Sequence, residues 1–172
     1  MKVTKTCRLP GPLGEMLLVA NPEGTALAGL YLANQKYFPD VAAQWEETPQ
    51  LPLFRAAAKQ LREYFAGART TFDLPLAPAG TPFQQQVWAA IATVPFAETI
   101  SYGELAARCG RPSAVRAAGA ATGRNPLTIV IPCHRIVGSG GALTGYAGGL
   151  DRKRTLLALE AAHVHPGLLA VA

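Results

Sequence analysis

The feature that most constrains this chain is the apolar stretch at residues 127–131, which is followed directly by Pro132 and Cys133. Its β-branched residues favour an extended backbone that enters the core. Pro132 has no backbone N–H, so it cannot continue the pairing of a strand. The next residues are His134 and Arg135. A neighbouring base or cation commonly makes a thiol nucleophilic, although most cysteines are only small buried apolar residues.

Several separated motifs add up to a resemblance to a known family. Pro-Cys-His-Arg at 132–135, Asn-Pro at 125–126 and Gly-Tyr-Ala-Gly-Gly at 145–149 resemble the signature of the O6-alkylguanine-DNA alkyltransferases, also called methylated-DNA–protein-cysteine methyltransferases. The resemblance covers most of the second half, roughly residues 81–160. It implies an α+β protein. A small N-terminal α/β domain of ribonuclease H-like fold, with a short antiparallel sheet, precedes a mostly helical, winged-helix-like domain with a helix-turn-helix.

The first half has the patterns of a small sheet and one helix. Residues 13–20 and 26–33 read as strands joined by the turn chemistry between them, which predicts a hairpin. Apolar residues recur at helical spacing over 53–65, and Gly67 is a suitable stop. Residues 70–80, rich in proline and glycine, are the best candidate for a linker.

The second half opens with a strong helix start. Thr81 is a candidate N-cap, Pro82 suits the first helical position, and Gln84 completes a capping box. This helix should end before Pro95. We expect Trp88 to lie in the core of this half, although a platform for base stacking is the alternative.

Two further short helices form a helix-turn-helix pattern. Ser101 and Glu104 read as a second capping box, and Ser113 as the cap of a helix over 114–122. Asp151 is the expected cap of the last helix.

We expect two domains: residues 1–75, a structural domain, and residues 81–165, for DNA binding and alkyl transfer. Residues 39–52 should form a loop with a helical turn, and residues 163–172 a solvated terminus.

Positive charge is concentrated in the second half. The 172 residues carry a net charge of +5. Residues 1–81 contain eight Lys or Arg against seven Asp or Glu, whereas residues 82–172 contain eight against four. This asymmetry favours a polyanionic partner for the second half, with a merely solvated basic face as the alternative.

The three cysteines, Cys7, Cys109 and Cys133, fit neither a disulfide framework nor a metal site. They favour a reducing compartment. No stretch is long and apolar enough to cross a membrane. We therefore expect a cytoplasmic protein, or a nuclear one in a eukaryote, with no membrane partner and no metal.

The resemblance implies a single-use methyltransferase for DNA repair. The thiolate of Cys133 attacks the alkyl carbon on O6 of guanine, and the thioether remains on the protein. His134 takes the thiol proton through a bridging water, Glu160 orients the imidazole, and Asn125 ties the helix-turn-helix to the active-site segment. No cofactor is required, and O4-alkylthymine is a candidate second substrate.

The resemblance also implies how DNA is bound. The second helix of the helix-turn-helix enters the minor groove, where its small residues permit close approach. The base is flipped out of the duplex, and Arg116 fills the space that it leaves. Tyr102, Tyr146, Ala147 and Gly148 bind the base, and Ala114, Arg116, Gly119, Arg124 and Arg135 contact DNA. Ala147 lacks the hydroxyl of the serine that some members carry, which affects the range of alkyl groups. We expect a monomer that can cluster on DNA.

Three other functions compete with this one. A non-catalytic alkyltransferase-like binder would lack the cysteine that this chain has at position 133. A thiol hydrolase using Cys133, His134 and Glu160 would leave Arg116 and the helix-turn-helix without a role. A winged-helix regulator would leave the Cys-His-Arg segment unexplained. A phosphate-binding loop at 145–149 is disfavoured because the Lys-Ser/Thr ending of such a loop is absent.

Overall fold

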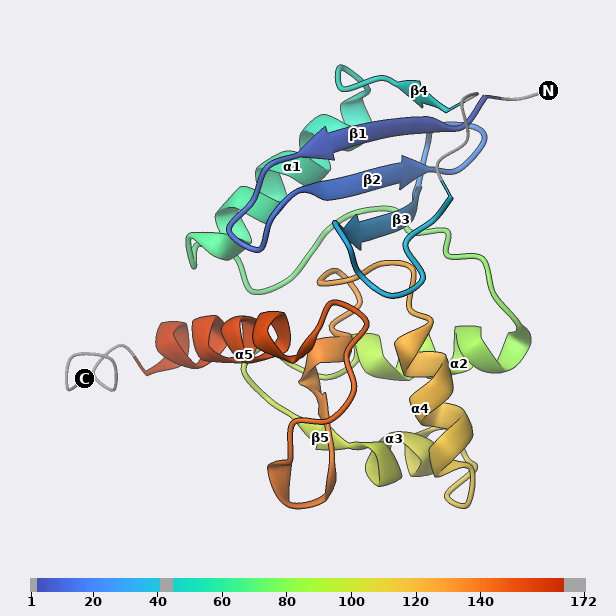
Figure 1. Ribbon diagram of the computed structural model, residues 1–172, viewed down its shortest axis with the longest axis vertical. Helices are drawn as coiled ribbons and strands as arrows, with labels where there is room; N and C mark the ends of the chain where they lie inside the picture. The colour runs from blue at the N-terminus through green and yellow to red at the C-terminus, as the bar shows by residue number, and fades with distance from the viewer. Residues whose placement is uncertain (1–2, 41–44, 166–172) are drawn as a thin grey trace. The chain divides into compact units, whose positions relative to one another are not determined.

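The computed structural model describes residues 3–40 and 45–165, and the chain is divided between two structural units (Figure 1). The first unit comprises Met1–Ala79 and Pro126–Val130, and the second comprises Gly80–Asn125 and Ile131–Ala172. The chain therefore returns to the first unit for a short segment just before Cys133. The apolar stretch that precedes the thiol is built into a different unit from the thiol itself.

The first unit contains a four-stranded sheet in the order β3-β2-β1-β4. Its strands are β1 (Lys5–Leu9), β2 (Met16–Ala20), β3 (Leu27–Leu32) and β4 (Glu46–Glu47). β1 and β3 flank β2 in antiparallel pairing, and β4 runs parallel to β1. The predicted hairpin is confirmed as β2 and β3. Its turn is held by Asn21, whose Oδ1 accepts hydrogen bonds from the backbone N–H groups of Thr25 and Ala26.

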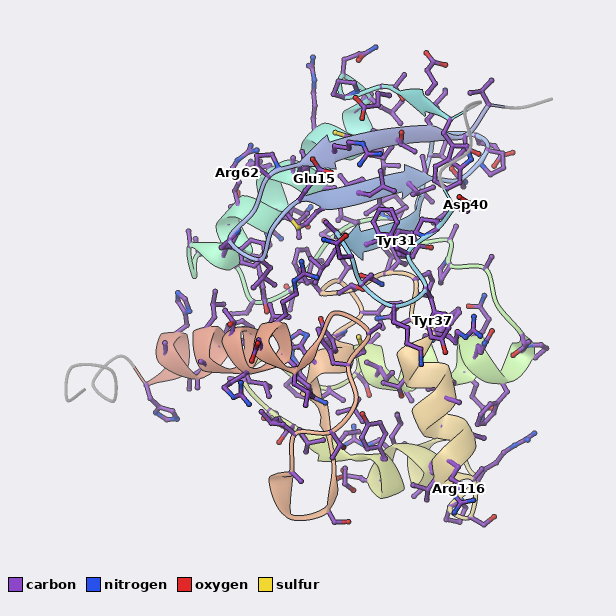
Figure 2. All side chains as sticks on the ribbon, in the orientation of Figure 1. Glu15, Tyr31, Tyr37, Asp40, Arg62 and Arg116 are labelled. Atoms are coloured by element: carbon purple, nitrogen blue, oxygen red, sulfur yellow. The ribbon has the colours of Figure 1, made fainter. Side chains whose placement is uncertain are left out.

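Among its described residues, the first unit contains one helix, α1 (Pro52–Phe65), as the apolar spacing predicts. Its buried stripe consists of Leu53, Phe54, Ala57, Ala58, Leu61 and Tyr64. Arg62 is exposed (Figure 2), whereas Gln60 lies on the buried side and its amide bonds to the backbone of Asp73. Gly67 adopts a left-handed φ of 76°, which suits a glycine at the end of a helix.

The free edge of β3 takes up two segments that are distant in sequence. Leu76 forms a parallel bridge with Leu27, so part of the predicted linker extends the sheet. Leu127 forms a parallel bridge with Leu30. The backbone N–H of Leu30 donates to the carbonyl of Pro126 at 2.8 Å. The apolar segment before Pro132 is therefore joined to β3 by one isolated bridge, between Leu127 and Leu30, and does not form a regular strand.

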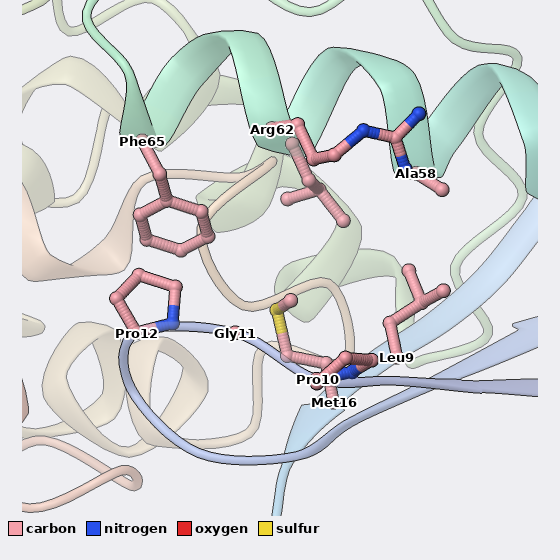
Figure 3. Close-up of a pocket in the computed structure, with 9 residues that line it drawn as sticks. Leu9, Pro10, Gly11, Pro12, Met16, Ala58, Arg62 and Phe65 are labelled. Carbon is pink, nitrogen blue, oxygen red and sulfur yellow. The ribbon is translucent and has the colours of Figure 1, made fainter.

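A hollow of about 260 Å³ lies in the first unit between α1 and the loop that joins β1 to β2 (Figure 3). Its walls are mainly apolar, and it contains none of the predicted site residues. The lining residues are Leu9, Pro10, Gly11, Pro12, Met16, Ala58, Leu61, Arg62 and Phe65.

Two predicted irregular segments extend beyond the described residues. The loop expected at 39–52 contains β4, and its residues 41–44 lie outside the description. In the terminus expected at 163–172, His163 and His165 are exposed, as predicted for a solvated end, and residues 166–172 lie outside the description.

The second unit is mostly helical, and the α+β class is confirmed. It contains α2 (Pro82–Ala92), α3 (Tyr102–Arg108), α4 (Val115–Gly123) and α5 (Leu150–Val164). The two-residue strands β5 (Ile100–Ser101) and β6 (Ile136–Val137) pair in parallel. Short 3₁₀ turns occur at η1 (Cys133–Arg135) and η2 (Ser139–Gly141). Trp88 is buried and donates from Nε1 to the carbonyl of Ala121 at 2.8 Å, so it belongs to the core of this unit. None of the helices in residues 3–40 and 45–165 is long and apolar enough to span a membrane.

The caps of these helices follow the sequence only in part. Thr81 and Gln84 form the complete capping box that was predicted. Ser101 caps α3, but the Glu104 carboxylate binds Arg108 and does not close a second box. Two predicted caps were wrong. Ala114, not Ser113, is the N-cap of α4, and Gly149, with φ of 92°, precedes α5, so Asp151 lies inside the first turn.

We expect Thr81→Ala to lower the free energy of unfolding by about 1 kcal/mol, because it removes the acceptor for the N–H of Gln84. Urea unfolding at neutral pH measures this loss. Thr93→Ala is the matched control, since the exposed Thr93 hydroxyl bonds only to a carbonyl of its own helix end. Equal losses in the two variants would contradict a specific contribution of the cap.

Candidate active site

Cys133 begins a tight turn in the second unit. Ile129 adopts a left-handed φ of 74°, which reverses the backbone before Pro132. Cys133 then starts η1, and its N–H donates to the carbonyl of Ile131 at 2.8 Å. Only 5% of the residue is exposed. Burial raises the pKa of the Cys133 thiol, while a hydrogen bond from Asn125 and the charge of Lys153 act in the opposite direction.

His134 and Glu160 lie together, as predicted. His134 Nε2 is 2.7 Å from Glu160 Oε1, and both side chains are completely buried. Burial lowers the pKa of His134 despite the opposing effect of Glu160, so the imidazole is neutral at pH 7. The carboxylate can only accept, so Nε2 carries the proton and Nδ1 is the basic nitrogen. Nδ1 has no hydrogen-bond partner among the described residues. A neutral imidazole with a free lone pair therefore lies next in sequence to a protonated thiol.

Arg135 has a different position from the one expected of a DNA contact. It is buried, and its guanidinium bonds to both oxygens of Glu160, with Nη2–Oε1 at 2.8 Å and Nε–Oε2 at 3.0 Å. Nη1 donates to the carbonyl of Val94 at 2.7 Å, and the group lies over the Phe96 ring. The Arg135 guanidinium thus has all its nitrogens bonded inside the protein and cannot also bind a phosphate on the surface. Its place is a structural one, as the bidentate partner of the Glu160 carboxylate.

Asn125 connects the end of α4 to the turn that bears the thiol. It directly follows Arg124, the C-cap of α4, and its Nδ2 donates to the carbonyl of Ile131 at 2.8 Å. The same side chain forms a hydrogen bond with the thiol of Cys133. The buried amide of Asn125 thus fixes the backbone before Cys133 and favours the thiolate form of the Cys133 side chain.

Tyr102 and the glycine-rich loop face each other beside this turn. The Tyr102 hydroxyl donates to the carbonyl of Thr144 at 3.1 Å and lies 3.3 Å from that of Gly145. The residues that follow in this loop, Tyr146, Ala147 and Gly148, are all half-buried. The loop therefore lies close to Tyr102.

Lys153 is the residue at this site that the sequence reasoning missed. It stands between Arg152 and Arg154, and three consecutive cations are typical of a solvated helix face. In the structure it is completely buried. Helical spacing could have revealed it, because Lys153, Leu156 and Glu160 recur at the interval of one buried face.

Helix α4 presents a mixed surface. Arg116 projects from its first turn and is exposed (Figure 2), as are Ala117 and Ala120. Arg124, at the other end of the helix, is exposed, and Ala114 is half-buried. Gly119 faces the ring of Tyr102, where an added Cβ would lie 3.7 Å from the ring. The exposed side therefore combines small residues with cations, whereas Ala118 and Ala121 are buried.

The geometry supports nucleophilic chemistry by a thiol. A thiol, a neutral imidazole and a buried carboxylate follow the order of nucleophile, base and orienting group. No cluster of three or more potential metal ligands occurs within residues 3–40 and 45–165.

Comparison with known proteins places both units in one family. The family described as "6-O-methylguanine DNA methyltransferase, DNA binding domain" matches residues 82–162. The one described as "6-O-methylguanine DNA methyltransferase, ribonuclease-like domain" matches residues 9–78. Together the two matches span most of the chain.

Whole-chain relatives agree with these matches. The methylated-DNA–protein-cysteine methyltransferase of Mycolicibacterium paratuberculosis is 49% identical over 152 residues, which cover 88% of this chain and 89% of the relative. The protein of that name from Methanosarcina barkeri is 47% identical, with coverages of 88% and 94%. The crystal structure of Mycobacterium tuberculosis OGT in complex with DNA has a TM-score of 0.85 and 43% identity, covering 92% of this chain and 94% of that one.

Proposed function

Because the chain belongs to the methylated-DNA–protein-cysteine methyltransferase family, we propose that Cys133 is the residue that accepts the alkyl group. The protein is a DNA-binding repair methyltransferase that transfers an alkyl group from DNA to a cysteine of its own. The observation that carries the assignment of Cys133 is that the next residue, His134, lies 2.7 Å from the buried carboxylate of Glu160. Cys7 lies in β1 and Cys109 at the end of α3.

The reaction is a displacement at the alkyl carbon. The Sγ–C bond forms while the bond between that carbon and O6 of guanine breaks, and its electron pair passes to the guanine. The thiol proton moves to Nδ1 of His134 through a bridging water, since adjacent residues in a chain rarely face each other directly. The imidazolium that forms is stabilised by Glu160. Guanine takes up a proton and leaves intact, and the thioether has no route back to a thiol, so each molecule acts once.

Access to the alkyl group requires that the nucleotide leave the duplex. Flipping has a free-energy cost of roughly a few kcal/mol. We assign Arg116 to the vacated space, since it projects from an α4 face with small neighbours that suits a minor groove. Ala114, Gly119 and Arg124 are assigned to the same interface. Tyr102 turns from the loop carbonyls to the guanine, and residues 146–148 form the wall of its pocket.

Arg116→Ala should separate chemistry from base flipping. We expect an unchanged rate with free O6-benzylguanine, which needs no flipping, and at least about tenfold slower repair of duplex DNA, by analogy with a lost contact of 1–3 kcal/mol. Single-turnover assays on both substrates measure this. Arg154→Ala, which removes an exposed cation from α5, controls for net charge. An equal loss on both substrates would contradict the role given to Arg116.

The rate of alkyl transfer should increase as the pH rises. Burial raises the pKa of the Cys133 thiol, so the thiolate fraction increases as the pH rises toward that pKa. The lowered pKa of His134 favours the neutral imidazole, which is the form that can accept the thiol proton. We therefore expect transfer from free O6-benzylguanine to accelerate between about pH 6 and pH 9. A rate that is level or falls across this range, in protein that circular dichroism shows to be folded, would be inconsistent with these directions.

One experiment distinguishes transfer from the competing hydrolase. Duplex DNA with a labelled methyl group on O6 of guanine is incubated with the protein, which is then digested. Transfer places the label on the peptide that contains Cys133, whereas a thiol hydrolase would release it as labelled methanol. A regulator without chemistry would leave the label on DNA.

The cysteines also bear on the cellular compartment of the protein. Three free cysteines suit a reducing compartment, and we place the protein in the cytoplasm. We expect it to bind damaged duplex as a monomer that can cluster along DNA. Sedimentation with and without a duplex tests the monomer: a stable dimer without DNA would contradict it.

A further inference from the structure

Gln35 is a buried polar side chain of the first unit that no step of the proposed reaction uses. It lies in the loop after β3, and only 6% of the residue is exposed. Its Oε1 accepts hydrogen bonds from the backbone N–H of Leu32 at 2.7 Å and from the hydroxyl of Thr128 at 3.3 Å. The second bond therefore joins the loop after β3 to the segment that leads into Cys133.

Thr128 is held by its backbone and by its side chain. Its N–H donates to the carbonyl of Leu30 at 3.1 Å, and its carbonyl accepts from the N–H of Val130 at 2.9 Å. Its hydroxyl donates to Gln35, and the residue is 2% exposed. Thr128 is thus the point at which the segment before Cys133 is fixed to the first unit.

Two consecutive three-residue turns separate Thr128 from the thiol. The hydrogen bond that the Thr128 carbonyl accepts closes a γ-turn around Ile129, whose φ is 74°. A γ-turn with positive φ is rare and strained, and more so for a β-branched residue. An inverse γ-turn follows at Pro132, with φ of −79° and ψ of 64°, closed by the 2.8 Å bond from the N–H of Cys133 to the carbonyl of Ile131. The direction in which the Cys133 backbone emerges therefore depends on the strained first turn.

We propose that Gln35 is a positioning residue for alkyl transfer: its amide oxygen holds Thr128, and Thr128 holds the strained turn that sets the backbone of Cys133. A strained turn persists only where its surroundings impose it. Asn125 fixes the end of the segment, at the carbonyl of Ile131, and Gln35 fixes its start. The first unit thus contributes a side chain to the geometry of the reaction. The inference rests on the proposed function of Cys133.

The test removes the hydroxyl of Thr128 and keeps the shape of its side chain. In Thr128→Val, Gln35 Oε1 retains the N–H of Leu32, so no buried acceptor is left unpaired. At saturating free O6-benzylguanine we expect single-turnover transfer at least about fivefold slower than in the parent, because the sulfur is less often in line with the alkyl carbon. The concentration that gives half the maximal rate should not change. Thr128→Ser, which keeps the hydroxyl, should stay within about twofold of the parent.

Thr6→Val is the matched control. Thr6 is a buried threonine of the same unit, and its hydroxyl donates to the carbonyl of Glu46 at 3.2 Å, between β1 and β4. We expect this variant to lose a similar free energy of unfolding in urea and to transfer the alkyl group at the parent rate. A parent-like rate in Thr128→Val would overturn the inference. Equal slowing in both variants would also overturn it, because the rate would then follow stability alone.

A second measurement reports on the turns without any alkyl transfer. Hydrogen exchange of the N–H groups of Val130 and Cys133, followed by NMR, should be at least about fivefold faster in Thr128→Val than in the parent or in Thr6→Val. In a Gln35→Met background, Thr128→Val should cause no further increase, since the hydroxyl has already lost its acceptor.

Two results of the exchange measurement would overturn the role of Gln35. One is unchanged exchange in Thr128→Val, and the other is a further increase when Thr128→Val is added to Gln35→Met. A failure of the proposed function has a different signature, in which the parent protein itself transfers no label to Cys133 whatever the exchange rates are.

Discussion

Replacing Cys133 with serine is expected to reduce alkyl transfer to background while the protein still binds duplex DNA. A serine hydroxyl ionises far less readily than a thiol, and neither His134 nor Glu160 can supply a different nucleophile. The substitution changes one atom in a buried turn, so the fold should persist. Transfer is measured with labelled methyl groups in duplex DNA, and binding by electrophoretic mobility shift with the same duplex.

The matched control is Cys109→Ser, the same change at a buried cysteine at the end of α3. We expect this variant to transfer the label at the parent rate. Retained transfer in Cys133→Ser would contradict the assignment of the nucleophile. Loss of transfer in both variants would mean that the substitution acts by disturbing the second unit.

Glu160→Gln should have the largest effect on stability. The Glu160 carboxylate accepts hydrogen bonds from His134, from two nitrogens of Arg135 and from the backbone N–H of Ala97. Neutralising it leaves a buried guanidinium without its counter-ion, which destabilises proteins by about 3–5 kcal/mol. The imidazolium formed during attack would also lose its stabilising charge, so transfer should slow by about 10²-fold or more. Urea unfolding and single-turnover transfer measure the two effects.

Two further variants separate these effects. Glu104→Gln breaks an exposed pair with Arg108 and should change stability by less than about 1 kcal/mol. Adding Arg135→Met to Glu160→Gln removes the orphaned charge and should recover part of the stability without recovering the rate. Recovery of both would argue that Glu160 acts only through folding.

Much of the fold follows from local patterns. The hairpin of β2 and β3 and helix α1 were predicted because their apolar spacing and turn residues lie within short windows. β1 and β4 were missed because one has weak alternation and the other only two residues. The pairing of β3 with residues 76 and 127 joins distant parts of the chain, which no local window contains.

The site shows the same division between local and distant information. Cys133 and His134 are marked by their motif, and Glu160 by the resemblance to a family. Arg135 was wrongly expected to contact DNA, and Lys153 was not singled out at all, because exposed positions are the normal expectation for cations. Arg135 is buried against Glu160, 25 residues away, and Lys153 is buried with its ammonium bonded to the loop at 144–145. The charge count of the second half therefore overstates the positive charge available on its surface.

The central claim is that one sulfur atom receives the alkyl group once. A fixed amount of protein is titrated with duplex DNA that carries labelled O6-methylguanine, and the label on the protein is counted at saturation. The account predicts one methyl group per molecule, all of it on the Cys133 peptide. More than one equivalent per molecule, or label on any other residue, would contradict it.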